Sequence, residues 1–153
     1  MQYRIKIVYN SMTPDEKQLV IHFWLSLNIL NEQEANRRVS EVVCLFFNEE
    51  SILVGVNSVY KEAFLQEDNP YYMYRTLIHP KHRVSYQLLM DALSTTYDFF
   101  QERSHSFEER GIGLIIENRK LKRNGAKDRL QKIGFNYLGK NPYQDDVWQR
   151  SFT

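Results

Sequence analysis

The sequence is poor in residues that cross-link or interrupt a fold. Among 153 residues there are one cysteine, six glycines and four prolines. A single cysteine excludes the internal disulfide framework that stabilises many small secreted domains. Scarce glycine and proline exclude collagen-like and low-complexity chains. The fold must therefore depend on a hydrophobic core.

Long apolar runs and an excess of one charge are also missing. No window reaches the roughly 18 uninterrupted apolar residues that a membrane-spanning helix needs. The N-terminus alternates polar and apolar residues and shows no secretory signal pattern. A formal net charge of +1 favours no class of partner. We therefore expect a cytoplasmic protein that makes no membrane contact.

What the sequence does contain is the composition of a globular domain. Hydrophobic residues make up 42% of the chain, charged residues 25% and aromatic residues 14%. This supply of large apolar side chains is enough to build one core without a metal or disulfides. Chains of this length usually form one core, so we expect residues 1–153 to form a single domain.

Periodicity and capping signals divide the chain into alternating strands and helices. The first helix has a clear start, because Thr13 suits an N-cap, Pro14 the first helical position and Glu16 a capping box. Its apolar stripe comprises Leu19, Val20, Phe23, Trp24, Leu27 and Leu30. The predicted strands are 3–9, 41–47, 52–60, 71–78, 111–116, 135–138 and 147–152, and the predicted helices are 14–30, 85–103 and 124–133. Residues 32–38 are predicted to form a short helix or a turn.

The order of these elements predicts the fold class. Three antiparallel-type strands in succession, followed by a strand–helix–strand unit, differ from a doubly wound sheet. We expect an α/β (α+β) fold with a mixed, mostly antiparallel sheet of six or seven strands, flanked by four helices.

Three short motifs resemble the GNAT N-acetyltransferase superfamily, in the family's order. Residues 47–56 resemble its second and third strands, which carry a Val-Gly step. Residues 77–83 read Leu-Ile-His-Pro-Lys-His-Arg and resemble the V-x-P-x-x-R signature that ends the fourth strand. Residues 129–135 read Arg-Leu-Gln-Lys-Ile-Gly-Phe and resemble the closing L-Y-E-K-x-G-F motif, with Asn124 as a counterpart of the family's asparagine. The resemblance covers nearly the whole chain.

The resemblance implies an acyl-CoA-dependent N-acyltransferase that needs no metal. Acetyl-CoA or another acyl-CoA would be the co-substrate, and a primary amine on a small molecule or a protein the acceptor. In this family the fourth strand is splayed from the fifth, and the pantetheine arm lies between them. The N–H groups at the start of the next helix bind the pyrophosphate. The implied coenzyme contacts are Leu77, Ile78, His82, Arg83, Val84, Ser85, Tyr86, Gln87 and Asn124.

The sequence departs from the family pattern at two places. Tyr86 and Leu88 occupy the two glycine positions of the phosphate loop, which makes the chain a divergent member. Leu130 occupies the position of the tyrosine that protonates the departing thiolate. Tyr74, or Tyr72 on the same strand, is a candidate donor in its place, and Glu117 is a candidate base for the amine.

Several interpretations stay open at this stage. Arg75 either faces the site and binds an acidic group, or is a solvent-facing strand residue. The basic stretch 119–132 is a solvated helix face, a contact for the coenzyme's phosphate or a nucleic-acid patch. The alternative function is therefore a GNAT-like binding or regulatory module without coenzyme, which includes nucleic acid as a partner. The sequence also leaves a homodimer open.

Overall fold

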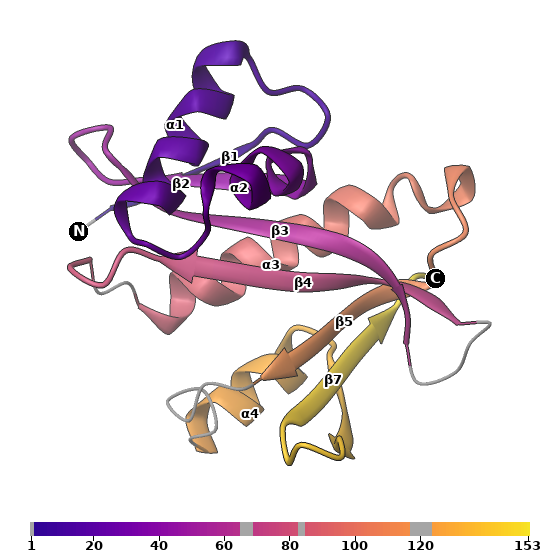
Figure 1. Cartoon of the computed structure of the whole chain (residues 1–153). Coiled ribbons are helices and arrows are strands. Elements are labelled where there is room, and N and C mark those ends of the chain that lie inside the picture. The colour runs from indigo at the N-terminus through magenta and orange to yellow at the C-terminus, as the bar shows by residue number, and fades with distance from the viewer. Residues whose placement is uncertain (1, 65–68, 83–84, 117–123) are drawn as a thin grey trace. The chain divides into compact units, whose positions relative to one another are not determined.

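The structure is a computed structural model, which describes the whole chain except residues 1, 65–68, 83–84 and 117–123 (Figure 1). The described elements match the expected order. The strands are β1 (Arg4–Ile7), β2 (Val42–Phe47), β3 (Leu53–Ala63), β4 (Pro70–Ile78), β5 (Gly111–Ile116), β6 (Asn136–Lys140) and β7 (Asp146–Ser151). The helices are α1 (Pro14–Ser26), α2 (Glu32–Arg38), α3 (Tyr86–Gln101) and α4 (Asn124–Lys132), with 3-10 turns η1 (Val39–Glu41) and η2 (Ser104–Ser106).

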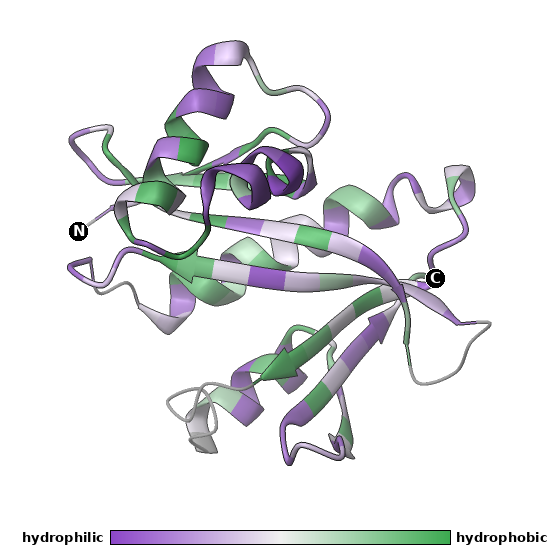
Figure 2. Ribbon diagram, viewed as in Figure 1, coloured by the Kyte–Doolittle hydropathy of each residue, from purple (hydrophilic) through white to green (hydrophobic). Residues whose placement is uncertain are grey.

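The seven strands form one sheet in the order β1-β2-β3-β4-β5-β7-β6. Strand β2 is antiparallel to β1 and β3, strands β4 and β5 are parallel, and β7 is antiparallel to both β5 and β6. Figure 2 shows β5 as mostly hydrophobic, as is typical of a strand inside a sheet, and α2 as mostly hydrophilic. The predicted mixed, mostly antiparallel sheet with four helices is confirmed.

The chain divides into two compact units. Residues 1–59 and 76–84 form the N-terminal unit, and residues 60–75 and 85–153 form the C-terminal unit. Strands β3 and β4 contribute residues to both units.

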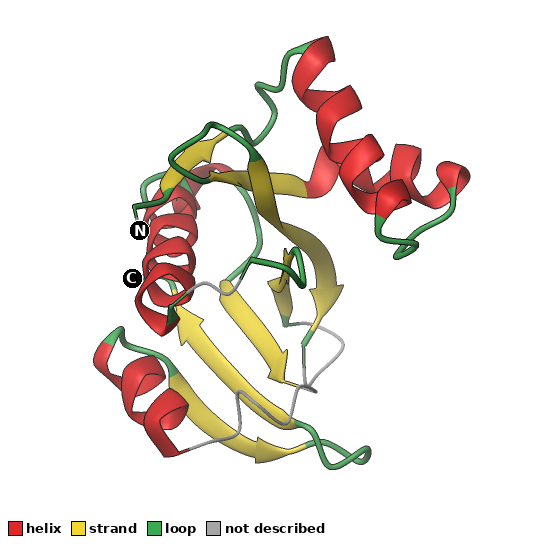
Figure 3. Ribbon diagram, turned by 90° about the vertical axis from the view of Figure 1, so that its left-hand side faces the viewer, coloured by secondary structure: helices red, strands yellow, loops and turns green. Residues whose placement is uncertain are grey.

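Helix α1 begins where the sequence predicts and ends earlier. The capping box is present, because Thr13 Oγ1 accepts from Glu16 N at 3.1 Å and Glu16 Oε1 accepts from Thr13 N at 2.9 Å. The helix ends at Ser26 and not near residue 30, because Asn28 has a left-handed φ of 55°. Asparagine tolerates this conformation better than most residues do, and it ends the helix. After a short loop, α2 follows beside α1 (Figure 3).

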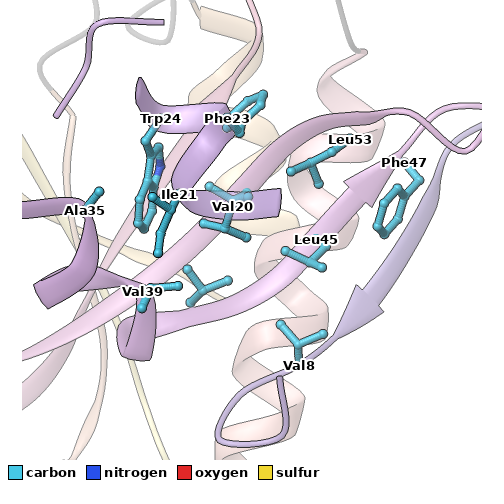
Figure 4. Close-up of a cluster of buried hydrophobic side chains, with 12 residues drawn as sticks. Val8, Val20, Ile21, Phe23, Trp24, Ala35, Val39, Leu45, Phe47 and Leu53 are labelled. Atoms are coloured by element: carbon cyan, nitrogen blue, oxygen red, sulfur yellow. The ribbon is translucent and has the colours of Figure 1, made fainter. Parts of the chain in front are cut away.

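The core of the N-terminal unit lies between α1, α2 and strands β2 and β3. Figure 4 shows side chains from these elements gathered in one cluster. Leu19, predicted to lie in the buried stripe, is 40% exposed, and Ile21 is buried in its place. The apolar run of α1 allows more than one buried face, and packing selects one. The buried members are Val8, Val20, Ile21, Phe23, Trp24, Ala35, Val39, Val42, Leu45, Phe47, Leu53 and Val56.

The predicted β2–β3 hairpin is also present. Asn48 organises its loop, because Asn48 Oδ1 accepts hydrogen bonds from Glu50 N and Ile52 N, each at 3.0 Å. Where β2 bulges, the side chain of the fully buried Asn57 accepts from Cys44 N at 2.7 Å. A strand asparagine thus satisfies an amide that the bulge takes out of the ladder.

The C-terminal unit packs its helices against the β5–β7–β6 part of the sheet. The ring of Phe100 on α3 stacks on that of Tyr72 on β4, with centroids 4.3 Å apart. Helix α4 ends in a turn closed by hydrogen bonds from Gly134 N to Gln131 O and from Phe135 N to Leu130 O, each 3.0 Å. Because Phe135 belongs to this turn, β6 begins one residue later than the sequence predicted.

Candidate functional site

Strands β4 and β5 are parallel neighbours that pair over a short distance only. Their register joins Tyr72 to Ile112 and Met73 to Gly113. Beyond these two pairs, β4 continues through Tyr74 and Arg75, which belong to the same unit as β5, and β5 continues to Ile116. All of these residues are in the described part of the chain. The two strands therefore stop pairing with each other in mid-sheet.

Met73 and Gly113 form the last pair before the strands separate. A Cβ on Gly113 would lie 2.7 Å from Met73 Sδ and 3.3 Å from the Phe64 ring. Glycine at this position thus leaves room for the Met73 side chain, which would have to shift if residue 113 carried a Cβ. Met73 is itself buried in a cluster with Phe64, Tyr71 and Val147. This cluster joins β4 to Val147 of β7, next to the point where β4 and β5 stop pairing.

The two faces of β4 carry different chemistry near this point. Tyr72 is 3% exposed and lies between the rings of Phe100 and Phe107, so it belongs to the core. Tyr74 lies on the same face by strand alternation and is half-buried. The opposite face carries Met73 and Arg75, and the Arg75 guanidinium lies 3.8 Å from the centre of the Tyr60 ring.

Helix α3 begins with a serine cap and no acidic residue. Ser85 Oγ accepts from Leu88 N at 3.2 Å. The first turns of α1 and α2 each contain two carboxylates, whereas the first turn of α3 contains none. Backbone N–H groups and the positive end of the helix dipole therefore face no carboxylate of that turn, an arrangement that suits an anion.

Tyr86 and Leu88, at the two positions where the family has glycine, lie in different surroundings. Leu88 is buried, so its side chain belongs to the core of the unit. Tyr86 is half-buried, and the Arg129 guanidinium of α4 lies 4.7 Å from the centre of its ring. Arg129 also bends back over its own helix, because a Cβ on Gly125 would lie 2.8 Å from its Nη1. Tyr86 thus holds a cation beside the start of α3.

Comparison with solved structures identifies the fold of the chain. No profile of a known protein family and no curated protein matches the sequence. Among solved structures, an N-acetyltransferase from Staphylococcus aureus matches with a TM-score of 0.64 and 10% identity over 99% of both chains. An acetyltransferase of the GNAT family from Listeria monocytogenes matches with a TM-score of 0.59 and 17% identity, over 97% of this chain and 94% of that one. A ribosomal-protein alanine acetyltransferase from Vibrio fischeri matches with a TM-score of 0.61 and 10% identity, over 99% and 92%.

The chain has the GNAT fold. The likeness covers almost the whole chain and at least 92% of each of these three neighbours. The resemblance seen in three short motifs is thereby confirmed for the fold.

The residues predicted to contact the coenzyme fall into three groups. Ser85, Tyr86 and Gln87 form the start of α3 in the C-terminal unit, where Gln87 Nε2 donates to Asp91 Oδ1 at 2.7 Å. Leu77, Ile78 and His82 lie in the N-terminal unit. There Leu77 packs against the core, and the His82 ring lies 5.4 Å from the His79 ring.

The remaining predicted residues lie outside the described part of the chain. These are Arg83, Val84 and Glu117, together with the side chain of Asn124, which is the first residue of α4. Of the two tyrosines considered as proton donors, Tyr74 has the more open position, because Tyr72 is in the aromatic core.

Two residues of this region were not singled out from the sequence. Arg129 was one cation in a basic stretch, and only its contact with Tyr86 distinguishes it. Tyr60 carried no signal at all, because its partner Arg75 lies on the next strand. In the described residues, no group of three His, Cys, Asp or Glu side chains could hold a metal, and no helix is long and apolar enough to cross a membrane.

Proposed function

We propose that the protein transfers an acyl group, most simply acetyl, from acyl-CoA to a primary amine. The observation that carries the proposal is the end of β4–β5 pairing after Met73 and Gly113. In the GNAT fold the pantetheine arm lies between these two strands, and the thioester is the activated acyl donor. That fold-level analogy is supported by neighbours that are named acetyltransferases.

The start of α3 and Arg129 would hold the phosphates of the coenzyme. The amides of the first turn donate to the pyrophosphate, and Ser85 fixes that turn as its cap. Arg129 adds a cation that Tyr86 keeps in place by stacking. In this proposal the tyrosine at a glycine position orients a phosphate ligand and does not obstruct the site.

The chemistry needs one C–N bond made, one C–S bond broken and two proton transfers. The acceptor nitrogen attacks the thioester carbonyl, a C–N bond forms and the C–S bond breaks. In this proposal Tyr74 protonates the departing sulfur, and the amine loses its proton to a base, for which Glu117 is our candidate. Positioning a neutral amine against the carbonyl supplies the rest of the rate enhancement.

Thermal unfolding in the presence of acetyl-CoA tests this function. Ligand at a hundredfold excess over its dissociation constant stabilises the folded protein by about 2.7 kcal/mol. For a domain of this size we expect Tm to rise by about 5–10 °C. Arg129→Gln should reduce this shift, whereas the control Lys132→Gln, an exposed lysine on the same helix, should leave it unchanged. Pantetheine, which lacks the phosphates, should give a smaller shift that Arg129→Gln does not alter.

The absence of any shift at millimolar acetyl-CoA would contradict the proposal. It would favour the alternative function, a GNAT-like module without coenzyme. The observation that favours this alternative is the bulk of Tyr86 where the family has glycine. Salt-dependent nucleic-acid binding that is lost on neutralising Lys122, Arg123 and Lys127 would then identify the partner.

A further inference from the structure

The unpaired stretch of β4 and β5 ends at a backbone pair. Pairing joins Tyr72 to Ile112 and Met73 to Gly113, in the amino-terminal half of both strands. The two strands are therefore separate from each other only toward their carboxyl ends. In the proposed function the pantetheine arm lies between the strands, and its phosphates bind outside them at the start of α3. The thioester end of the arm then comes nearest to the pair of Met73 and Gly113.

The two faces of the sheet differ in how much surface they leave beside this pair. Tyr72 and Leu114 are buried on one face, where the Phe100 ring of α3 stacks on Tyr72. On the opposite face Gly113 has no side chain, and Ile115 is 39% exposed although β5 lies between β4 and β7. An exposed isoleucine in an interior strand offers apolar surface that an acyl group can cover. The acyl group therefore fits on the face of Gly113 and Ile115.

The side chain of Met73 occupies the space beside Gly113 on this same face. A Cβ on Gly113 would lie 2.7 Å from Met73 Sδ and 3.1 Å from Met73 Cε. Behind the thioether lie Phe64, Tyr71 and Val147, which form one buried cluster with Met73. Met73 thus has filled space behind it, and an acyl group that reaches the last backbone pair must stop against its side chain.

We propose that Met73 is a specificity-determining residue that limits the acyl donor to a short apolar group, acetyl or propionyl. Each further methylene would have to displace the thioether from a packed cluster, and overfilling a packed space is unfavourable. The inference rests on the proposed acyl transfer and names the class of acyl-CoA that the same site accepts.

Binding of a graded series of thioesters tests the inference without knowledge of the acceptor. The probes are CoA and its acetyl, propionyl, butyryl, hexanoyl and succinyl thioesters, each titrated into the protein by calorimetry. We expect the Kd values of acetyl-CoA and propionyl-CoA to lie within about 4-fold of each other, the effect of one methylene. Hexanoyl-CoA should bind about 10- to 100-fold more weakly than acetyl-CoA, the range that overfilling a packed space costs.

Shortening Met73 should move the preferred length of the acyl group. Met73→Ala removes Cγ, Sδ and Cε, so butyryl-CoA should bind about 10- to 20-fold more tightly than acetyl-CoA, at about 4-fold for each of its two further methylenes. Met73→Val has a larger, β-branched side chain that suits a strand, so it should shift the preference less, to propionyl-CoA. Met73→Leu conserves the volume and should keep the order of the parent protein.

Met90→Ala is the matched control for the loss of a buried methionine. Met90 belongs to the same unit as Met73 and is also buried, but it lies on α3. This variant should lower stability and leave the order of the acyl-CoA affinities unchanged. Circular dichroism at the temperature of the titration establishes that each variant is folded, and Met73→Val carries the same test if Met73→Ala does not fold.

Four outcomes overturn the inference and leave coenzyme binding intact. They are equal affinity of the parent protein for all the thioesters, an unchanged order in the folded Met73 variants, the same change of order in Met90→Ala, and a preference for succinyl-CoA, which would show that a charge selects the donor. If neither CoA nor any of its thioesters binds, the proposed function is refuted, and this inference with it.

Discussion

Gly134 meets two separate requirements at the end of α4. Its φ of 89° is in the left-handed region, which closes the helix with the turn described above. A Cβ at this position would lie 2.8 Å from Arg150 Nε. Arg150 cannot easily move away, because its guanidinium stacks 3.7 Å from the centre of the Tyr97 ring and its Nη1 donates to Ile133 O at 2.8 Å.

Replacing Gly134 should therefore destabilise the protein more than replacing a glycine that meets only one requirement. Gly139 is the matched control, because its φ is 100° but a Cβ there would meet nothing within 4 Å. We expect Gly139→Ala to lower the free energy of unfolding by about 1–2 kcal/mol. Gly134→Ala should cost at least about 1 kcal/mol more, since Arg150 must give up its contacts. Urea unfolding of both variants measures the difference, and equal costs would contradict the role of Arg150.

Residue-scale prediction from the sequence succeeded where the cause is local. The predicted end of the last helix at residue 133 is one residue from the observed end at Lys132, because Gly134 follows and glycine after an amphipathic run is a common terminator. Its contact with Arg150 could not be predicted, because Arg150 belongs to the last strand. The stacking of Arg75 on Tyr60 could not be predicted either, because it joins residues of two different strands.

Among the elements, α2 shows how far local signals reach. The sequence predicted a short helix or turn at residues 32–38, and the structure shows a helix with these bounds. Asn31 Oδ1 caps it by accepting from Glu34 N at 2.8 Å, and the helix has glutamates in its first turn and arginines in its last. Glu34 binds both Arg37 and Arg38, three and four positions along the helix. The hydrogen bond from Arg37 is the main cause that lowers the pKa of the Glu34 carboxyl from 4.5 to about 2.

This lowered pKa predicts a pH dependence of stability. A carboxyl group whose pKa is lower in the folded state stabilises the fold above its unfolded pKa. We expect the contribution to be complete above about pH 5 and to be lost as the pH falls from about 4.5 to about 2. Chemical unfolding of Glu34→Gln should show a smaller loss of stability than the parent protein across this window. Glu32→Gln, in the same first turn but without an ion pair within the described residues, is the control.

An identical acid response in Glu34→Gln and the parent would contradict the assignment. The contribution itself will be small, because exposed ion pairs are weak and are screened by salt. Raising the salt concentration should therefore reduce the difference between the two proteins.

At the scale of the whole molecule, two units share two strands. Strands β3 and β4 each begin in one unit and end in the other, so each unit contains part of both. Unfolding of either unit therefore disrupts part of a strand that continues along the chain into the other unit. Each unit also contains one buried tryptophan, Trp24 in the N-terminal unit and Trp148 in the C-terminal unit.

The shared strands predict a single cooperative unfolding transition. In Trp148→Phe the fluorescence reports Trp24 alone, and in Trp24→Phe it reports Trp148 alone. We expect the fluorescence midpoint of each variant to coincide with its far-UV circular dichroism midpoint in urea. The two variants will differ in stability, so each is compared only with itself. Separate midpoints within one variant would show that the units unfold independently.

Local signals in the chain were sufficient for the elements, their order and the fold class. Helix caps, hydrophobic periodicity and helix-ending glycines involve residues only a few positions apart, so they can be recognised in the sequence. The three motifs were enough to indicate the GNAT fold. The sequence also indicated the start of α3 as a candidate phosphate site, because the first N–H groups of a helix have no partners within the helix.

The folded chain alone decided which side chains meet across elements. Leu19 is exposed and Ile21 buried, because packing selects one face of an apolar run. Three contacts join residues that are distant in the chain. They are the short pairing of β4 with β5, the stacking of Arg129 on Tyr86 and the stacking of Arg75 on Tyr60. Such contacts depend on how elements pack, which no local pattern encodes. The candidate site could therefore be described only from the folded structure.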